Sequence, residues 1–231
     1  MNSEPLRGVI FDLDNTLFDF ISMKEKAVEA AAWAMVDAGL PLEVDEVRRR
    51  IFGVYRIEGI EFQSVFDTML REVMGRVEPK ILAAGIVAYR RAREAMLVPY
   101  PHTRSTLVAL VRRGIKLAVV SDAPALQAWL RLCYLQIDNL FDAIVTFDDT
   151  GEAKPSPKPF QLALKQLKLR PAQTLMLGDW VERDLLGAKN LGMRTVHARY
   201  GSEVPDGEPE PLADDVIDDI GELVEIVDRW A

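Results

Sequence analysis

The chain has 231 residues, of which 49% are apolar and 28% are charged, and 28 basic against 36 acidic residues give a net charge of −8. The apolar content excludes a disordered chain, and the negative charge disfavours a binder of nucleic acid, which must neutralise phosphates. The single cysteine, Cys133, excludes an internal disulfide framework and a zinc site built from cysteines. No apolar run reaches the 18 residues of a membrane span, and Met1–Pro5 lacks the features of a signal peptide. We therefore expect a cytoplasmic globular protein with no nucleic-acid or membrane partner.

The first predicted element is a strand. Gly8–Phe11 is a short apolar run that stops at acidic residues, which is typical of a strand buried on both faces. From about residue 20 to residue 95 apolar residues recur at helical spacing, and Gly39–Pro41 and Val77–Pro79 divide this stretch into several helices. The segment Gly53–Gly59 interrupts the helical pattern, and we expect a loop there.

After residue 99 strands and helices alternate. The predicted strands are Lys116–Val120, Ala143–Thr146, Thr174–Leu177 and Arg194–His197, and the predicted helices are Thr103–Arg113, Ala125–Cys133, Pro159–Leu167 and Leu185–Leu191. Cys133 is expected in the core, and Glu203–Asp219 is expected as a surface loop before a last strand and helix. The alternation predicts an α/β fold with a parallel sheet and right-handed crossovers. We expect this core to comprise residues 1–19 and 99–231, interrupted by an all-helical insertion of residues 20–98.

Polar residues follow three of the predicted strands. Asp12 follows the first strand, Ser121-Asp122 follows the second, and Gly178-Asp179 follows a later one. Ligands of open parallel sheets bind at the carboxyl ends of the strands. The sequence therefore predicts one site that these residues share.

Two acidic segments each allow two interpretations. In Asp12–Thr16 the polar side chains are typical of a turn, but carboxylates two residues apart repel and favour a divalent cation between them. In Gly178–Asp184, Asp179 or Glu182 complements the dipole of a following helix. Oxygen ligands from Asp12 and Asp179 would also suit octahedral Mg²⁺.

A rigid loop carries the candidate cation. Three prolines at alternate positions hold Gly151–Phe160 extended, and Pro159 suits the first position of the next helix. Lys158 is interpreted as an ordinary solvated lysine, whereas Lys154 is the counter-charge that the acidic segments require. The hydroxyl of Ser121 is a candidate donor to a phosphate oxygen.

These residues occur in a familiar order. Asp12-x-Asp14-x-Thr16, Ser121, Lys154-Pro155, and Gly178-Asp179 with Asp184 resemble the four motifs of the haloacid dehalogenase (HAD) superfamily of phosphohydrolases. The resemblance covers residues 6–19 and 100–225, and it implies a Rossmann-like core in which the helical insertion is a cap domain of the C1 type. Asn15 stands where many relatives have glycine, and asparagine also tolerates a left-handed backbone.

The resemblance implies an activity and a set of roles. It implies a Mg²⁺-dependent phosphatase that acts on a small phosphorylated metabolite through an aspartyl-phosphate. The implied catalytic residues are Asp12 as the nucleophile, Asp14 as the general acid and base, and Lys154. The implied Mg²⁺ ligands are the carboxylates of Asp12 and Asp179 and the backbone carbonyl of Asp14. Asp184 and Thr16 are implied to orient these ligands without binding the metal themselves. Ser121, Asp122 and Lys154 are the implied substrate-binding residues of the core.

Several alternatives remain at this stage. Arg56, within Gly53–Gly59, is the candidate substrate-binding residue of the cap, although an ordinary turn between helices would explain that segment equally well. A phosphomutase of the β-phosphoglucomutase kind uses the same motifs. A haloacid dehalogenase is disfavoured by Asp14, and a non-catalytic binding protein is disfavoured because every motif residue is present. The sequence predicts neither the particular metabolite nor the oligomeric state.

Overall fold

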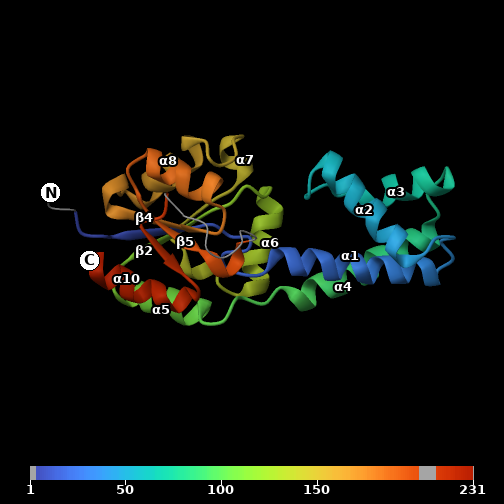
Figure 1. The fold of residues 1–231 in the computed structure, drawn as a ribbon, viewed down its shortest axis with the longest axis horizontal. Coiled ribbons are helices and arrows are strands. Elements are labelled where there is room, and N and C mark those ends of the chain that lie inside the picture. Colours follow the sequence, from blue (N-terminus) through green and yellow to red (C-terminus); the bar gives the residue numbers. More distant parts are fainter. Residues whose placement is uncertain (1–3, 203–211, 231) are drawn as a thin grey trace. The chain divides into compact units, whose positions relative to one another are not determined.

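The computed structural model describes residues 4–202 and 212–230. The chain separates into two compact units (Figure 1). One unit combines the two ends of the chain, up to Asp19 and from Val98 onward, and the other is the continuous stretch Phe20–Leu97.

The first unit is built on a parallel sheet. Its strands within the described residues are β1 (Gly8–Phe11), β2 (Lys116–Val120), β3 (Ala143–Val145), β4 (Thr174–Gly178), β5 (Arg194–Ala198) and β6 (Asp215–Ile217). The strand order is β3-β2-β1-β4-β5-β6, and every neighbouring pair is parallel. This confirms the predicted α/β class, and it places β1 between β2 and β4, so that the residues following these three strands are neighbours.

Helices cover both faces of this sheet. They are α5 (Thr103–Arg112), α6 (Ala125–Leu135), α7 (Phe147–Thr150), α8 (Pro157–Leu167), α9 (Leu186–Asn190) and α10 (Leu223–Trp230). In Figure 1, α7 and α8 lie on one side of the strands, and α5 and α10 lie on the other. Ile10 of β1 packs with Phe160 of α8 on one face, and Val9 and Phe11, which point to the other face, are fully buried as well. Burial on both faces explains why the central strands are continuously apolar.

The second unit is entirely helical. Its helices are α1 (Phe20–Asp37), α2 (Val44–Glu58), α3 (Val65–Met74) and α4 (Pro79–Met96). The unit has an apolar core of its own, which includes Met35 of α1, Ile51 of α2, Met69 of α3 and Ile81 of α4. Among the described residues of the whole chain, no helix combines the length and the hydropathy that a membrane span requires.

Four local expectations differ from the structure. The predicted loop at Gly53–Gly59 is wrong, because α2 continues to Glu58 and buries Val54 and Tyr55 beside Val47 and Ile51. Helix α8 begins at Pro157 rather than Pro159, since Ser156 accepts a hydrogen bond from the backbone N–H of Lys158 and caps the helix. Strand β6 lies inside the segment predicted as a loop, of which residues 203–211 lie outside the described residues. Cys133 is exposed rather than in the core.

The two segments at which the helical unit joins the sheet unit lie next to each other. Phe18 and Pro99 form an antiparallel bridge, and the backbone N–H of Tyr100 donates to the carbonyl of Leu17 at 3.0 Å. The Tyr200 hydroxyl donates to the carbonyl of Thr16 at 2.8 Å, and its ring packs edge-on against that of Tyr100. The chain therefore leaves and re-enters the sheet unit at one anchored point.

Candidate active site

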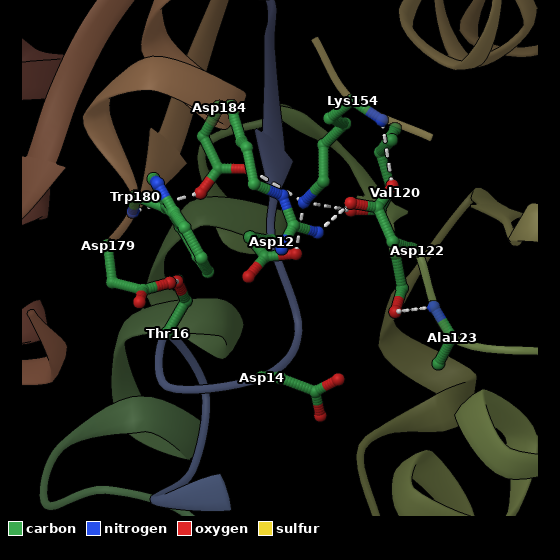
Figure 2. Close-up of polar contacts among 12 residues, drawn as sticks. Asp12, Asp14, Thr16, Val120, Asp122, Ala123, Lys154, Asp179, Trp180 and Asp184 are labelled. Carbon is green, nitrogen blue, oxygen red and sulfur yellow. Dashed lines mark hydrogen bonds and ion pairs between the residues drawn. The ribbon is translucent and has the colours of Figure 1, made fainter. Parts of the chain in front are cut away.

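Asp12, Ser121-Asp122 and Asp179 lie at the carboxyl ends of β1, β2 and β4 respectively. The ladder of the sheet continues one residue past the strands, because the N–H of Asp12 donates to Leu177 and the N–H of Ser121 donates to Val145, both at 2.9 Å. The side chains at these positions are thereby held on the rigid edge of the sheet rather than on free loops. Figure 2 shows them gathered around Asp12.

Three buried carboxylates form the centre of the site. Asp12, Asp179 and Asp184 each offer one oxygen, and these oxygens lie within 4.8 Å of one another. The three residues are 7%, 8% and 1% exposed. Burial, together with the charges of Asp12 and Asp184, raises the pKa of Asp179 to about 9, and burial raises the pKa of Asp184 to about 6 despite the opposing effect of Lys154. Such a group requires cations to remain ionised, and carboxylate oxygens are ligands that Mg²⁺ prefers.

Lys154 supplies one of these cations from within the protein. Its ammonium forms ion pairs with Asp12 and, at 2.7 Å, with Asp184, and it donates to the carbonyl of Val120 at 3.1 Å. Burial lowers the pKa of Lys154, but the two carboxylates outweigh this effect and raise it well above its usual value. One ammonium faces three carboxylates, so the residues present fit a divalent cation as the remaining counter-charge.

Asp14 lies outside this group. In Figure 2 its carboxylate points away from that of Asp12. Its Oδ2 accepts a hydrogen bond of 2.7 Å from Nη1 of Arg131, a buried residue of α6 that the sequence analysis missed. The adjacent Asn15 has φ of +60°, which confirms that asparagine adopts the left-handed backbone here.

Neighbouring groups fix the orientation of Asp179 and Asp184. The Thr16 hydroxyl donates to Oδ1 of Asp179 at 3.2 Å, and His197 forms a 3.0 Å hydrogen bond with the backbone carbonyl of Asp179. The N–H of Trp180 donates to Oδ2 of Asp184 at 3.1 Å. A Cβ at Gly178 would lie 2.4 Å from that same oxygen, so Asp184 can fold back over the strand end only beside glycine. Thr16 thus contacts Asp179, and Asp184 contacts Lys154 and the backbone that follows β4. Their supporting roles stay predictions.

Ser121 and Asp122 make different contacts. The buried Ser121 hydroxyl accepts a hydrogen bond from the N–H of Ala123 at 3.2 Å. The carboxylate of Asp122 accepts from the N–H of Lys154 at 2.9 Å and pairs with Arg183, whose guanidinium lies 4.6 Å from the centre of the Trp180 ring. Asp122 therefore ties together the loops that follow β2 and β4 and the loop that carries Lys154.

Two arginines were absent from the predicted site, and the predicted arginine belongs to the helical unit. Arg131 contacts Asp14 from within an ordinary helical pattern, and Arg183 contacts Asp122 from within Gly178–Asp184, where only the acidic residues were considered. The spacing of these arginines from other residues does not indicate their contacts. Arg56 lies in the last turn of α2 in the helical unit, and its side chain is exposed.

Comparison with known proteins decides the family. Residues 6–192 match the haloacid dehalogenase-like hydrolases. The chain belongs to this family. It is 35% identical over 222 residues to a glyceraldehyde 3-phosphate phosphatase of Methanocaldococcus jannaschii, covering 96% of this chain and 97% of the relative. It is 34% identical over 227 residues to a protein of the same name from Methanothermobacter thermautotrophicus, covering 96% and 100%.

Solved structures agree on the HAD fold. A HAD phosphatase from Thermococcus onnurineus superposes with a TM-score of 0.70 at 24% identity, over 96% of this chain and 98% of that one. The near full-length relatives are phosphatases by name. The expectation of a HAD-like phosphatase is confirmed, and the non-catalytic alternative is not supported.

Proposed function

We propose that this HAD-like phosphatase hydrolyses a small phosphorylated metabolite with the help of Mg²⁺, through an aspartyl-phosphate on Asp12. The observation that carries the proposal is the buried group of three carboxylates around Lys154. A buried group with this excess of negative charge suits a metal-assisted reaction of an anionic substrate.

Asp12 is the proposed nucleophile. One of its carboxylate oxygens attacks phosphorus in line, a new P–O bond forms, and the bond between phosphorus and the substrate oxygen breaks. Lys154 contacts Asp12 directly, which orients the carboxylate and places a positive charge beside the oxygens of the transferred group. Water then cleaves the aspartyl-phosphate, which releases phosphate and restores Asp12.

Asp14 is the proposed general acid and base. It donates a proton to the oxygen of the leaving alcohol and later accepts one from the attacking water. Both steps use the same carboxyl group, so the proton balance closes over one turnover. The contact between Arg131 and Asp14 makes Arg131 the group that fixes where this carboxylate rests.

Mg²⁺ would be held by the carboxylates of Asp12 and Asp179 and by the backbone carbonyl of Asp14. When bound, the metal offsets the repulsion between an anionic nucleophile and an anionic phosphate. Thr16 and Asp184 orient the ligands, and Ser121 and Lys154 bind the phosphoryl oxygens. We assign Asp122 to positioning the Lys154 loop, because its carboxylate oxygens already accept from Lys154 and Arg183.

The substrate class is inferred from the relatives and from the chain itself. Relatives of near full length are named for glyceraldehyde 3-phosphate, and a 33% identical relative from Aquifex aeolicus is named phosphoglycolate phosphatase. We propose a similarly small metabolite as the substrate, with the helical unit, residues 20–98, acting as the cap that selects it. The net charge of −8 disfavours nucleic acid as a partner.

The test is a phosphate-release assay over a panel of compounds with Mg²⁺. The panel contains glyceraldehyde 3-phosphate, phosphoglycolate, sugar phosphates, nucleoside monophosphates and p-nitrophenyl phosphate. We expect release from p-nitrophenyl phosphate and a higher kcat/KM on one compact metabolite. Isomerisation of a sugar phosphate without phosphate release would instead identify the phosphomutase, and efficient dephosphorylation of folded phosphoproteins would overturn the small-substrate proposal.

A further inference from the structure

A buried lysine in the helical unit takes no part in the site described above. Lys24 lies on α1 and is 7% exposed. Its ammonium nitrogen lies 4.2 Å from the centre of the Tyr55 ring, 5.7 Å from that of Tyr89 and 5.9 Å from that of Phe20. Three helices of the same unit, α1, α2 and α4, thus place aromatic rings around one positive charge.

The charge of Lys24 lacks an anionic partner. Within residues 4–202 and 212–230, no carboxylate forms an ion pair with Lys24, and no hydrogen bond satisfies its ammonium. Lys26, two residues along α1, differs from Lys24 in both respects: it is solvent-exposed, and it forms an ion pair with Glu29 at 2.9 Å. Aromatic faces attract a cation but carry no net charge, so the charge of Lys24 remains uncompensated. A buried charge without its counter-ion is costly to the fold.

The charged end of Lys24 is reachable from solvent. The ammonium is not among the fully enclosed, unbonded polar atoms of the described residues, so the small exposed part of the side chain includes the nitrogen. Tyr55 lies beside it, and burial, Tyr89 and Glu61 raise the pKa of Tyr55 well above its usual value, which keeps the hydroxyl protonated. The cluster therefore combines an accessible cation, a neutral hydroxyl and apolar walls.

We propose that Lys24 is the charged group of a binding site in the helical unit for a small oxyanion, a carboxylate or a phosphate. A bound oxyanion would supply the negative charge that no carboxylate of the described residues supplies to Lys24. The rings of Phe20, Tyr55 and Tyr89 take the place of part of the water around the ammonium, which strengthens its attraction for an anion relative to that of an exposed lysine. The anion has two sources, namely a second anionic group on the substrate or a separate small-molecule effector.

Thermal denaturation of the full-length protein tests the site with inorganic phosphate as the probe. The measurement is made in a chelator, which removes divalent metal. Without metal, the negative charges of Asp12, Asp179 and Asp184 disfavour binding of phosphate at the active site. Melting temperatures are compared in phosphate and in sodium chloride of equal ionic strength. We expect phosphate to raise the Tm of the wild type by about 3 °C or more, Lys24→Met to abolish this response, and Lys24→Arg to retain it.

Two further readouts separate binding from structure. Lys26→Met, the matched control on the same helix, should respond to phosphate as the wild type does. Lys24→Met should melt in chloride at or above the wild-type temperature, because it removes a buried charge that has no partner. An equal phosphate response in wild type and Lys24→Met would overturn the proposal. So would a large loss of Tm in Lys24→Met with the phosphate response retained, since that would assign Lys24 to packing alone.

A kinetic comparison identifies the source of the anion. It rests on the proposed phosphatase activity, and failure of that activity would appear separately, as wild-type protein that releases no phosphate from p-nitrophenyl phosphate. If the anion belongs to the substrate, Lys24→Met lowers kcat/KM for phosphoglycolate at least tenfold more than for p-nitrophenyl phosphate. Equal losses on the two compounds identify a separate anion.

Discussion

Replacing Lys154 by methionine should destabilise the protein and inactivate it together. The substitution keeps an unbranched apolar stem of similar length but removes the ammonium that contacts Asp12 and Asp184. Breaking a buried ion pair from one side costs about 3–5 kcal/mol. At about 2–4 °C per kcal/mol for a chain of this size, Tm should fall by roughly 6–20 °C. Phosphate release should fall by about 100-fold or more, as when an electrostatic donor is removed from an active site.

Differential scanning calorimetry in chelator measures the loss of Tm in Lys154→Met. The same scan with Mg²⁺ separates the effect of the lost positive charge from the effect of altered side-chain packing. Added Mg²⁺ should restore part of the lost Tm, because it replaces a positive charge among the carboxylates, but it should not restore turnover. Lys158→Met is the matched control, since Lys158 lies four residues away in an exposed pair with Glu152, and exposed pairs contribute about 1 kcal/mol or less. A Lys154→Met protein that melts within 2 °C of the control, or that keeps a tenth of wild-type turnover, would refute the reasoning.

The remaining predictions concern the nucleophile, the metal, pH and the helical unit. Asp12→Asn should fold, as judged by circular dichroism, yet lose essentially all turnover, because an amide is neither a nucleophile nor an anionic ligand; a tenth of wild-type activity would remove Asp12 from that role. Activity should vanish in chelator and return with Mg²⁺, whereas Ca²⁺, which favours longer bonds and more ligands, should inhibit; full activity in chelator would contradict a metal-dependent reaction. The raised pKa values of Asp184, about 6, and Asp179, about 9, mean that ionisation opposes folding, so the metal-free protein should lose stability as pH rises from about 4 through these values. The gain in Tm from Mg²⁺ should accordingly be larger at pH 8.5 than at pH 6, and a gain independent of pH would contradict this linkage. Arg56→Ala should raise KM for the preferred metabolite far more than for p-nitrophenyl phosphate, and equal losses would exclude Arg56 from specificity.

The strands of the sheet were predictable because they are buried on both faces. Continuous apolar runs such as Gly8–Phe11 and Leu117–Val120 are typical of that environment, and the structure has strands at both positions. The residues that follow them could be assigned to one site because parallel strands present their carboxyl ends at a single edge. Asp12, Asp179 and Asp184 do lie together there. Their catalytic and metal-binding roles stay predictions.

Helix α6 shows why the rest could not be predicted. An amphipathic interpretation places Cys133 inside and Arg131 outside, but the helix buries Arg131 against Asp14 and leaves Cys133, Leu126 and Trp129 exposed. The buried Arg131 forms a tertiary ion pair with Asp14, a residue 117 positions away. Local periodicity carries no information about such a partner.

The helical break expected at Gly53 failed for a related reason. Glycine weakens a helix by about 1 kcal/mol, and burial of apolar side chains on one face of α2 outweighs that local preference. Val47, Ile51, Val54 and Tyr55 are the buried residues of α2, and they continue the helical period through Gly53. Propensity alone was therefore a poor guide at this position.

The paired segments Phe18 and Pro99 have an evolutionary consequence. Phe18 and Pro99 pair as antiparallel neighbours. The two ends of the inserted 78 residues, Phe20–Leu97, are therefore joined to adjacent points of the sheet unit. Any other segment with two adjacent ends could be grafted at the same place without disturbing the strand order of the sheet. The inserted segment can therefore change during evolution while the sheet edge that carries Asp12, Asp179 and Asp184 stays unchanged. Protein engineering can use the same freedom by placing another protein's insertion between Asp19 and Val98.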